Sequence, residues 1–260
     1  MNNIKKRSFS NGWTGFLSVL AEKYNLSFVF GAPPSTDGKT IFLPALPYGI
    51  SDDDVTIIKG DALHEIGHIK FSDFEVRKQN VCKGQFWLSL HNAIEDPWME
   101  NKTKMLTRRT EHYLRESVRI FNIKHPRDFS TMYIDQLFVG YVLCYGFSSV
   151  LKWNEYDASL ASYEESLESK FGDRWFDVSS IVNRYLSAGL LQSRSSGDNA
   201  IMADQILAAL LALREEGAKE DEKPNAGEKS ESDPSQNSDS EELSTDGDDD
   251  DSSPDNTDGG

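Results

Sequence analysis

The sequence is poor in cysteine, in long apolar runs and in positive charge. Its 260 residues include two cysteines, Cys82 and Cys144, neither within a Cys-x-x-Cys pair, which excludes a disulfide framework and a thiolate metal site. No apolar run approaches the roughly 20 residues that a membrane span requires. Lys and Arg number 27 against 43 Asp and Glu, so the formal net charge is −16 and a nucleic-acid partner is not expected. We therefore expect a cytoplasmic protein without a membrane partner.

The N-terminal segment superficially resembles a secretory signal. The basic residues Lys5, Lys6 and Arg7 precede a short apolar run at residues 16–21. The run is too short for a signal peptide, and an amphipathic pattern continues beyond it. The segment is therefore predicted to be the first helix of the folded domain.

The negative charge is concentrated at the C-terminal end. Residues 219–260 contain sixteen Asp or Glu and three Lys, which gives −13 of the total charge of −16. Ala226 and Leu243 are its only aliphatic side chains, so the segment cannot bury enough apolar surface to offset the entropy of ordering. The sequence predicts a folded domain at residues 1–216 and a disordered acidic tail at residues 217–260.

The most informative motif is His-Glu-Ile-Gly-His at residues 64–68. On a helix, His64 and His68 lie on one face, one turn apart, where both imidazoles can bind one zinc ion at roughly 2.0–2.1 Å. Glu65 is then placed to act as a general base on a water molecule. A separate apolar stripe, with Ile58 and Ile66 among its members, packs the other side of this helix, and residues 51–54 (Ser-Asp-Asp-Asp) supply its N-cap and acidic first turn.

A catalytic zinc site needs a third protein ligand, and the segment Leu90–Asp96 offers it. As a helix, it places His91, Asn92 and Glu95 on one face. Glu95 is the predicted third ligand, while Asp96 and Asn92 are expected to orient a ligand histidine from behind. His91 and Asp96 remain alternatives for the third ligand. A solvated Glu-Asp pair is the alternative without a metal.

These two segments, with Glu100 following, resemble the metallopeptidase-like N-terminal region of the cobaltochelatase T-subunit family and its phage-borne relatives. The resemblance covers roughly residues 40–105 by motif and the acidic tail by composition. It implies a zincin-like fold, an ATPase partner and, if the chain is phage-encoded, a location in the host cytoplasm. The family also has a von Willebrand factor A domain, which this sequence does not resemble at any point, so we expect a shortened form or a piece of a longer chain. Pro97 and Trp98 also depart from the family, and Pro97 predicts a kink after Glu95.

The expected fold class is α+β and mainly α: a zincin-like metallopeptidase fold with a small β-sheet, then a helical subdomain and the disordered acidic tail. Two strands, at residues 26–30 and 40–44, are predicted to form a hairpin or two edge strands, with the second as the candidate substrate-binding strand by resemblance. The pattern after Glu100 predicts five helices, at residues 108–120, 132–151, 156–170, 175–186 and 199–214.

Two functions from different classes are compatible with these features. The first is a zinc-dependent metallopeptidase that acts on a peptide or protein substrate, with Zn²⁺ held by His64, His68 and Glu95 and with Glu65 as the catalytic base. The second is a catalytically inactive interaction module, like the cobaltochelatase subunit, that partners an ATPase or a downstream von Willebrand-type module. Glu65 favours the enzyme because a structural metal site has no use for a general base.

Overall fold

The computed structural model describes residues 25–45 and 50–221. The chain divides into two units, residues 1–221 and 222–260, and all the described residues belong to the first. The helix predicted at residues 16–21 and most of the predicted acidic tail therefore lie outside the described residues. The predicted domain boundary at residue 216 falls inside the last helix, which continues to Asp221.

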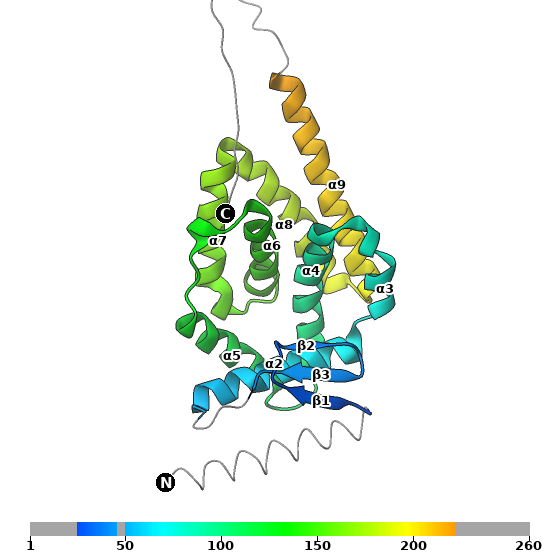
Figure 1. Cartoon of the computed structure of the whole chain (residues 1–260). Coiled ribbons are helices and arrows are strands. Elements are labelled where there is room, and N and C mark those ends of the chain that lie inside the picture. The colour runs from blue at the N-terminus through cyan, green and yellow to red at the C-terminus, as the bar shows by residue number, and fades with distance from the viewer. Residues whose placement is uncertain (1–24, 46–49, 222–260) are drawn as a thin grey trace, which may run out of the picture. The chain divides into compact units, whose positions relative to one another are not determined.

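Helices make up most of the described structure, as the sequence predicts (Figure 1). Each of the five predicted downstream helices is present with shifted ends, and the second ends in a π-helical turn, η3. The helices are α2 (Asp52–Phe71), α3 (Phe74–Gln79), α4 (Gln85–Thr103), α5 (Thr110–Lys124), α6 (Ile134–Tyr145) with η3 (Gly146–Val150), α7 (Asp157–Phe171), α8 (Trp175–Gln192) and α9 (Ser196–Asp221).

The sheet has three short strands in the order β1-β3-β2: β1 (Ser27–Phe30), β2 (Ser35–Thr36) and β3 (Thr40–Leu43). The predicted hairpin is wrong, because β1 and β3 pair in parallel, and β2, inside the predicted turn-rich loop, pairs antiparallel with β3. The proposed substrate-binding strand β3 is consequently the central strand, with neighbours on both sides. The two edge strands beside it are β1 and β2.

The sheet packs on α2 through a small apolar core (Figure 1). Ile41 and Leu43 of β3 meet the predicted stripe of α2, including Ile58 and Ile66, and all four side chains are buried. Ser51 caps α2 through a capping box with Asp54, as the sequence predicts. Leu63 belongs instead to a second, larger core that the other helices form. The motif helix α2 is therefore packed on two sides, which fixes its rotation.

Two glycines let other helices approach α2 closely. A Cβ atom on Gly60 would overlap the side chain of Ser117 in α5, and one on Gly67 would overlap Met99 and Thr103 in α4. Pro97 lies inside α4, which continues through it to Thr103. The close contact at Gly67 brings the polar part of α4 next to the histidines of α2.

Among the described residues, none of the helices combines the length and apolar character that crossing a bilayer would need.

Candidate metal centre

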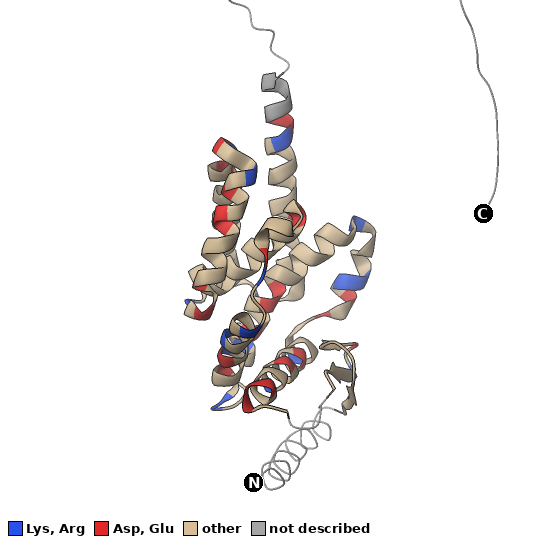
Figure 2. Ribbon diagram, turned by 60° about the vertical axis from the view of Figure 1, so that its left-hand side comes forward, with Lys and Arg blue, Asp and Glu red and all other residues tan. Residues whose placement is uncertain are grey.

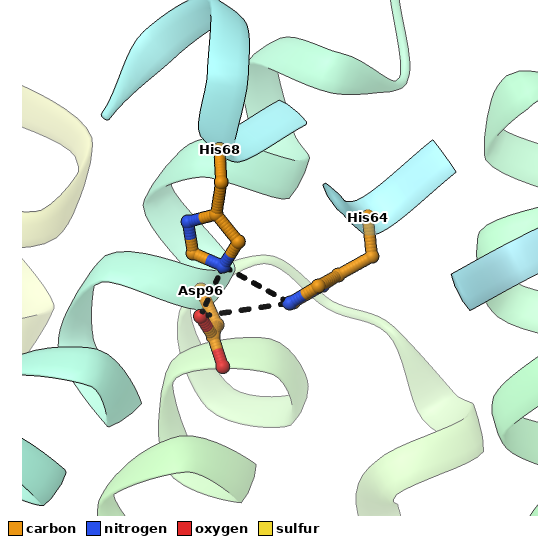
Figure 3. A group of neighbouring side chains, drawn as sticks. All are labelled: His64, His68 and Asp96. Carbon is orange, nitrogen blue, oxygen red and sulfur yellow. Dashed lines mark hydrogen bonds and ion pairs between the residues drawn. The ribbon is translucent and has the colours of Figure 1, made fainter. Parts of the chain in front are cut away.

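Three side chains from two helices point at one another in the manner expected of metal ligands (Figure 3). His64 and His68 come from α2 and Asp96 comes from α4. The Nε2 atoms of the two histidines lie 3.1 Å apart. Asp96 Oδ1 lies 3.3 Å from His68 Nε2 and 3.8 Å from His64 Nε2. These three atoms form one small triangle, whose longest side joins Asp96 Oδ1 to His64 Nε2.

The size of this triangle fits a tetrahedral metal ion. Ligand atoms at 2.0–2.1 Å from a tetrahedral zinc are about 3.3 Å from each other, close to the three observed separations. Asp96 Oδ1 is buried and accepts no hydrogen bond, although it lies within ion-pair distance of both imidazoles. A buried carboxylate oxygen without a hydrogen bond is costly unless a cation compensates it. The residues present therefore fit a divalent metal with two imidazoles and one carboxylate.

Each of the three side chains is held from behind by a further polar group. His64 Nδ1 lies 2.6 Å from Glu100 Oε1, and His68 Nδ1 lies 2.9 Å from Ser72 Oγ. Asn92 Nδ2 donates a 3.0 Å hydrogen bond to Asp96 Oδ2. Such bonds to the remote ring nitrogen orient Nε2 toward the centre of the triangle and are the usual support of metal-binding histidines.

The electrostatics of the metal-free site follow from this arrangement. Burial alone would lower the pKa of His64, but Asp96 and the hydrogen bond to Glu100 raise it to about 10. Burial alone would raise the pKa of Asp96, but His64 and His68 bring it below its usual 3.8. Without a metal, protonated His64 and ionised Asp96 are thus the favoured forms, and the two groups form an ion pair.

Glu65 stands beside the triangle without belonging to it. Its side chain is buried, and burial raises its pKa, an effect that His64 and His68 oppose. It lines two cavities, of about 510 and 710 Å³, and His64 lines both as well. Glu65 is therefore next to the histidines and accessible from both cavities, as a general base in this position must be.

Glu95, the third ligand expected from the sequence, lies outside the group of three. Its Oε1 accepts a short hydrogen bond from Ser196 Oγ, at the start of α9, and its Oε2 lies 3.9 Å from His91 Nδ1. His91, the competing candidate, stacks on Trp87 and bonds the carbonyl of Ser196. Asp96, which was expected to orient a histidine from behind, is instead the carboxylate that lies with the two histidines. Glu95 and His91 instead contact Ser196, whose Oγ also accepts a hydrogen bond from the backbone N–H of Asp73. These contacts connect α9 to α4 and to the start of α3.

Sequence reasoning missed the roles of Glu100, Ser72 and Ser196. Glu100 follows Asp96 by four residues, so the helical period alone would have placed both carboxylates on one face. Ser72 follows His68 by four residues and was open to the same argument. Nothing in the sequence signals Ser196, which is about a hundred residues away from Glu95 in the chain.

Acidic residues, red in Figure 2, are spread over the helices, and four of them interact electrostatically with His64. Asp61 and Glu65 come from α2, and Asp96 and Glu100 come from α4. Four carboxylates around two imidazoles leave an excess of negative charge, which favours a cation in or near the site.

Comparison of the chain with protein-family models, with curated proteins and with solved structures finds no match.

Proposed function

We propose that the protein is a zinc-dependent metallopeptidase with a zincin-like fold, in which His64, His68 and Asp96 hold the metal. The observation that carries this proposal is the convergence of three ligand atoms from two helices, with Glu65 adjacent. Two imidazoles, one carboxylate and an open fourth position are the ligand set of many zinc peptidases. The proposal keeps the metal and the base expected from the sequence and replaces Glu95 by Asp96 as the third ligand.

A zinc ion in this position supplies Lewis acidity, by which it polarises a carbonyl and makes water a nucleophile at neutral pH. The protein contributes the groups that move protons. Glu65, buried beside the histidines, accepts the proton of the attacking water and delivers it to the leaving amine. Glu100 accepts a hydrogen bond from His64 Nδ1–H, which holds the tautomer whose Nε2 faces the triangle.

The cavities provide the space for a substrate on either side of these groups. The cavity of about 510 Å³ is largely polar and includes Ser35 and Thr36 of the outer strand β2, as well as His68 and Asp96. The cavity of about 710 Å³ has many apolar side chains on its walls. Since His64, Glu65, Pro34 and Leu143 line both cavities, a bound peptide can pass the histidines with residues in each.

A second candidate function is a non-catalytic interaction module that partners an ATPase, as the cobaltochelatase resemblance implies. One observation favours it: the metal-free site is internally paired, because His64 meets Glu100 and His68 meets both His64 and Ser72. The site could therefore persist in a fold that no longer binds metal. This alternative gives no role to the buried Glu65.

The two functions separate in one set of measurements on the full-length protein. Metal analysis of protein purified without chelator should give about one zinc per chain, and His64→Ala and His68→Ala should lose it. Glu65→Gln should keep the zinc and lower peptide hydrolysis by 10²–10⁴-fold, because an amide cannot take a proton from water. Glu165→Gln, an exposed change on α7, is the matched control. If the wild-type protein binds zinc but cleaves no member of a broad peptide library, the interaction module replaces the peptidase.

A further inference from the structure

The cavity of about 710 Å³ beside the histidines has a composition that suits one kind of side chain. Its walls include Ile57 and Ile58 from α2 and Leu114, Val118 and Phe121 from α5. Asp61, Glu65 and Glu100 add carboxylates to the same cavity, which we call the Asp61 pocket. A pocket with apolar walls and acidic groups is complementary to a long aliphatic side chain that ends in a cation.

Two of these carboxylates are available to a ligand. Asp61 is half-buried, and none of the described residues forms a hydrogen bond with its carboxylate. Glu100 is 5% exposed, and while its Oε1 bonds His64, its buried Oε2 has no hydrogen-bond partner. A buried carboxylate oxygen without a donor, such as Glu100 Oε2, is rare in folded proteins and indicates a missing cation or donor.

The two groups also lie close enough to affect each other. Burial raises the pKa of Asp61 to about 6, with further contributions in the same direction from Glu65 and Glu100, although His64 opposes them. An ammonium or guanidinium group next to Asp61 would relieve both the desolvation and the repulsion between like charges.

The cationic groups already in the pocket do not take this role. Arg127 also lines the pocket, but its Nη1 donates a 2.7 Å hydrogen bond to the hydroxyl of Tyr163. His125 packs on the ring of Phe121, with the ring centroids 4.7 Å apart. Because Arg127 is a cation in the wall of the pocket, the competing possibility is that the pocket binds an acidic side chain.

We propose that the Asp61 pocket binds a lysine or arginine side chain of the substrate, next to the bond that is cleaved. The aliphatic part of this side chain lies between α2 and α5, and its cationic end lies at Asp61 and Glu100. This inference rests on the proposed peptidase function only in treating the bound peptide as a substrate. The preference for a basic side chain depends on the pocket alone. Asp61 is thus a specificity residue and not a catalytic one.

Binding of matched peptides to the full-length protein tests the inference without hydrolysis. The probes are acetylated, amidated alanine pentapeptides whose central residue is lysine, norleucine or glutamate, measured with protein as purified and with protein treated with chelator. Norleucine matches the aliphatic part of lysine and lacks the cation. We expect the lysine peptide to bind at least tenfold more tightly than the norleucine peptide, and the glutamate peptide to bind most weakly.

The variant Asp61→Asn should remove this preference by weakening lysine binding about tenfold and leaving norleucine binding unchanged. It is expected to fold, because it removes a buried charge. The control Asp135→Asn changes an exposed acid at the start of α6 and should alter neither affinity. Equal affinity for lysine and norleucine, preference for glutamate, or no detectable lysine binding in the wild-type protein would each overturn the inference. Because chelated protein also gives the answer, the absence of peptidase activity would not affect this test.

Discussion

Glu95 and Asp96 are consecutive residues of α4 whose carboxylates meet different parts of the molecule. Glu95 accepts a hydrogen bond from Ser196 of α9, whereas Asp96 Oδ1 lies 3.3 Å from His68 Nε2 of α2. The rotation of about 100° between neighbouring helical positions separates them. One carboxylate thus connects helices and the other faces the candidate metal site.

This division gives opposite expectations for two neighbouring substitutions. Asp96→Ala should lose zinc because it removes a ligand atom, whereas Glu95→Gln should retain it because the amide oxygen still accepts from Ser196. Zinc content after purification without chelator measures both. Loss of zinc in Glu95→Gln with retention in Asp96→Ala would restore the ligand set expected from the sequence.

Glu100→Gln tests the support of His64. The amide oxygen can still accept from His64 Nδ1, but the negative charge that strengthens this bond is gone, so zinc should stay bound 10- to 100-fold more weakly. Competition with a chromogenic chelator measures the affinity, with Glu165→Gln as the control. An unchanged affinity would mean that the 2.6 Å contact does not assist metal binding.

Gly67→Ala tests whether the spacing of α2 and α4 sets the site. The added methyl group would overlap Met99 and Thr103, which are fully buried, and overpacking of this kind costs about 1–3 kcal/mol. We expect a lower thermal midpoint and weaker zinc binding, since α4 carries Asp96. The control Gly197→Ala, where the nearest atom is 3.4 Å from the new Cβ, should change neither. A stable Gly67→Ala protein with normal zinc affinity would show that α4 adjusts freely.

Asp61 makes stability depend on pH in a defined window. Its pKa is raised from 3.8 to about 6 by burial, so above pH 6 the folded state carries a charge that it disfavours, on the order of 3 kcal/mol. As pH falls from 6 to 4, the folded state takes up a proton before the unfolded state does, and this cost disappears. Asp61→Asn should therefore be more stable than the wild-type protein at pH 7 and equal to it near pH 4. Denaturant unfolding at both pH values measures the difference, and a constant difference would contradict the assignment.

The sequence predicts the local features of this protein better than its pairings. The N-cap at Ser51, the stripe of Ile58 and Ile66 and the adjacency of His64 and His68 all depend on residues within two helical turns, and each is present. The choice between Glu95 and Asp96 depends on how α4 is rotated. α4 is buried on nearly every side, so its apolar pattern does not mark a single face.

The strand pairing shows the same limit. Parallel pairing of β1 with β3 requires the chain between them to turn back, and that segment forms β2 within a stretch rich in Gly and Pro. The Gly and Pro residues predict a turn between the strands, but they do not predict which strands pair with each other. Ser196 is a further case, since its contact with Glu95 depends on how α9 packs against α4.

The close approach at Gly67 bears on how relatives of this protein can be found. The general pattern His-Glu-x-x-His leaves two positions free, yet here Ile66 lies in the core under the sheet and Gly67 touches α4. Packing thus restricts the two positions that the general pattern leaves free. A search pattern that requires an aliphatic residue and then glycine, followed by a carboxylate pair four residues apart on a later helix, would select for this helix spacing. Such a pattern would discriminate against chance matches far better than the two histidines and the glutamate do.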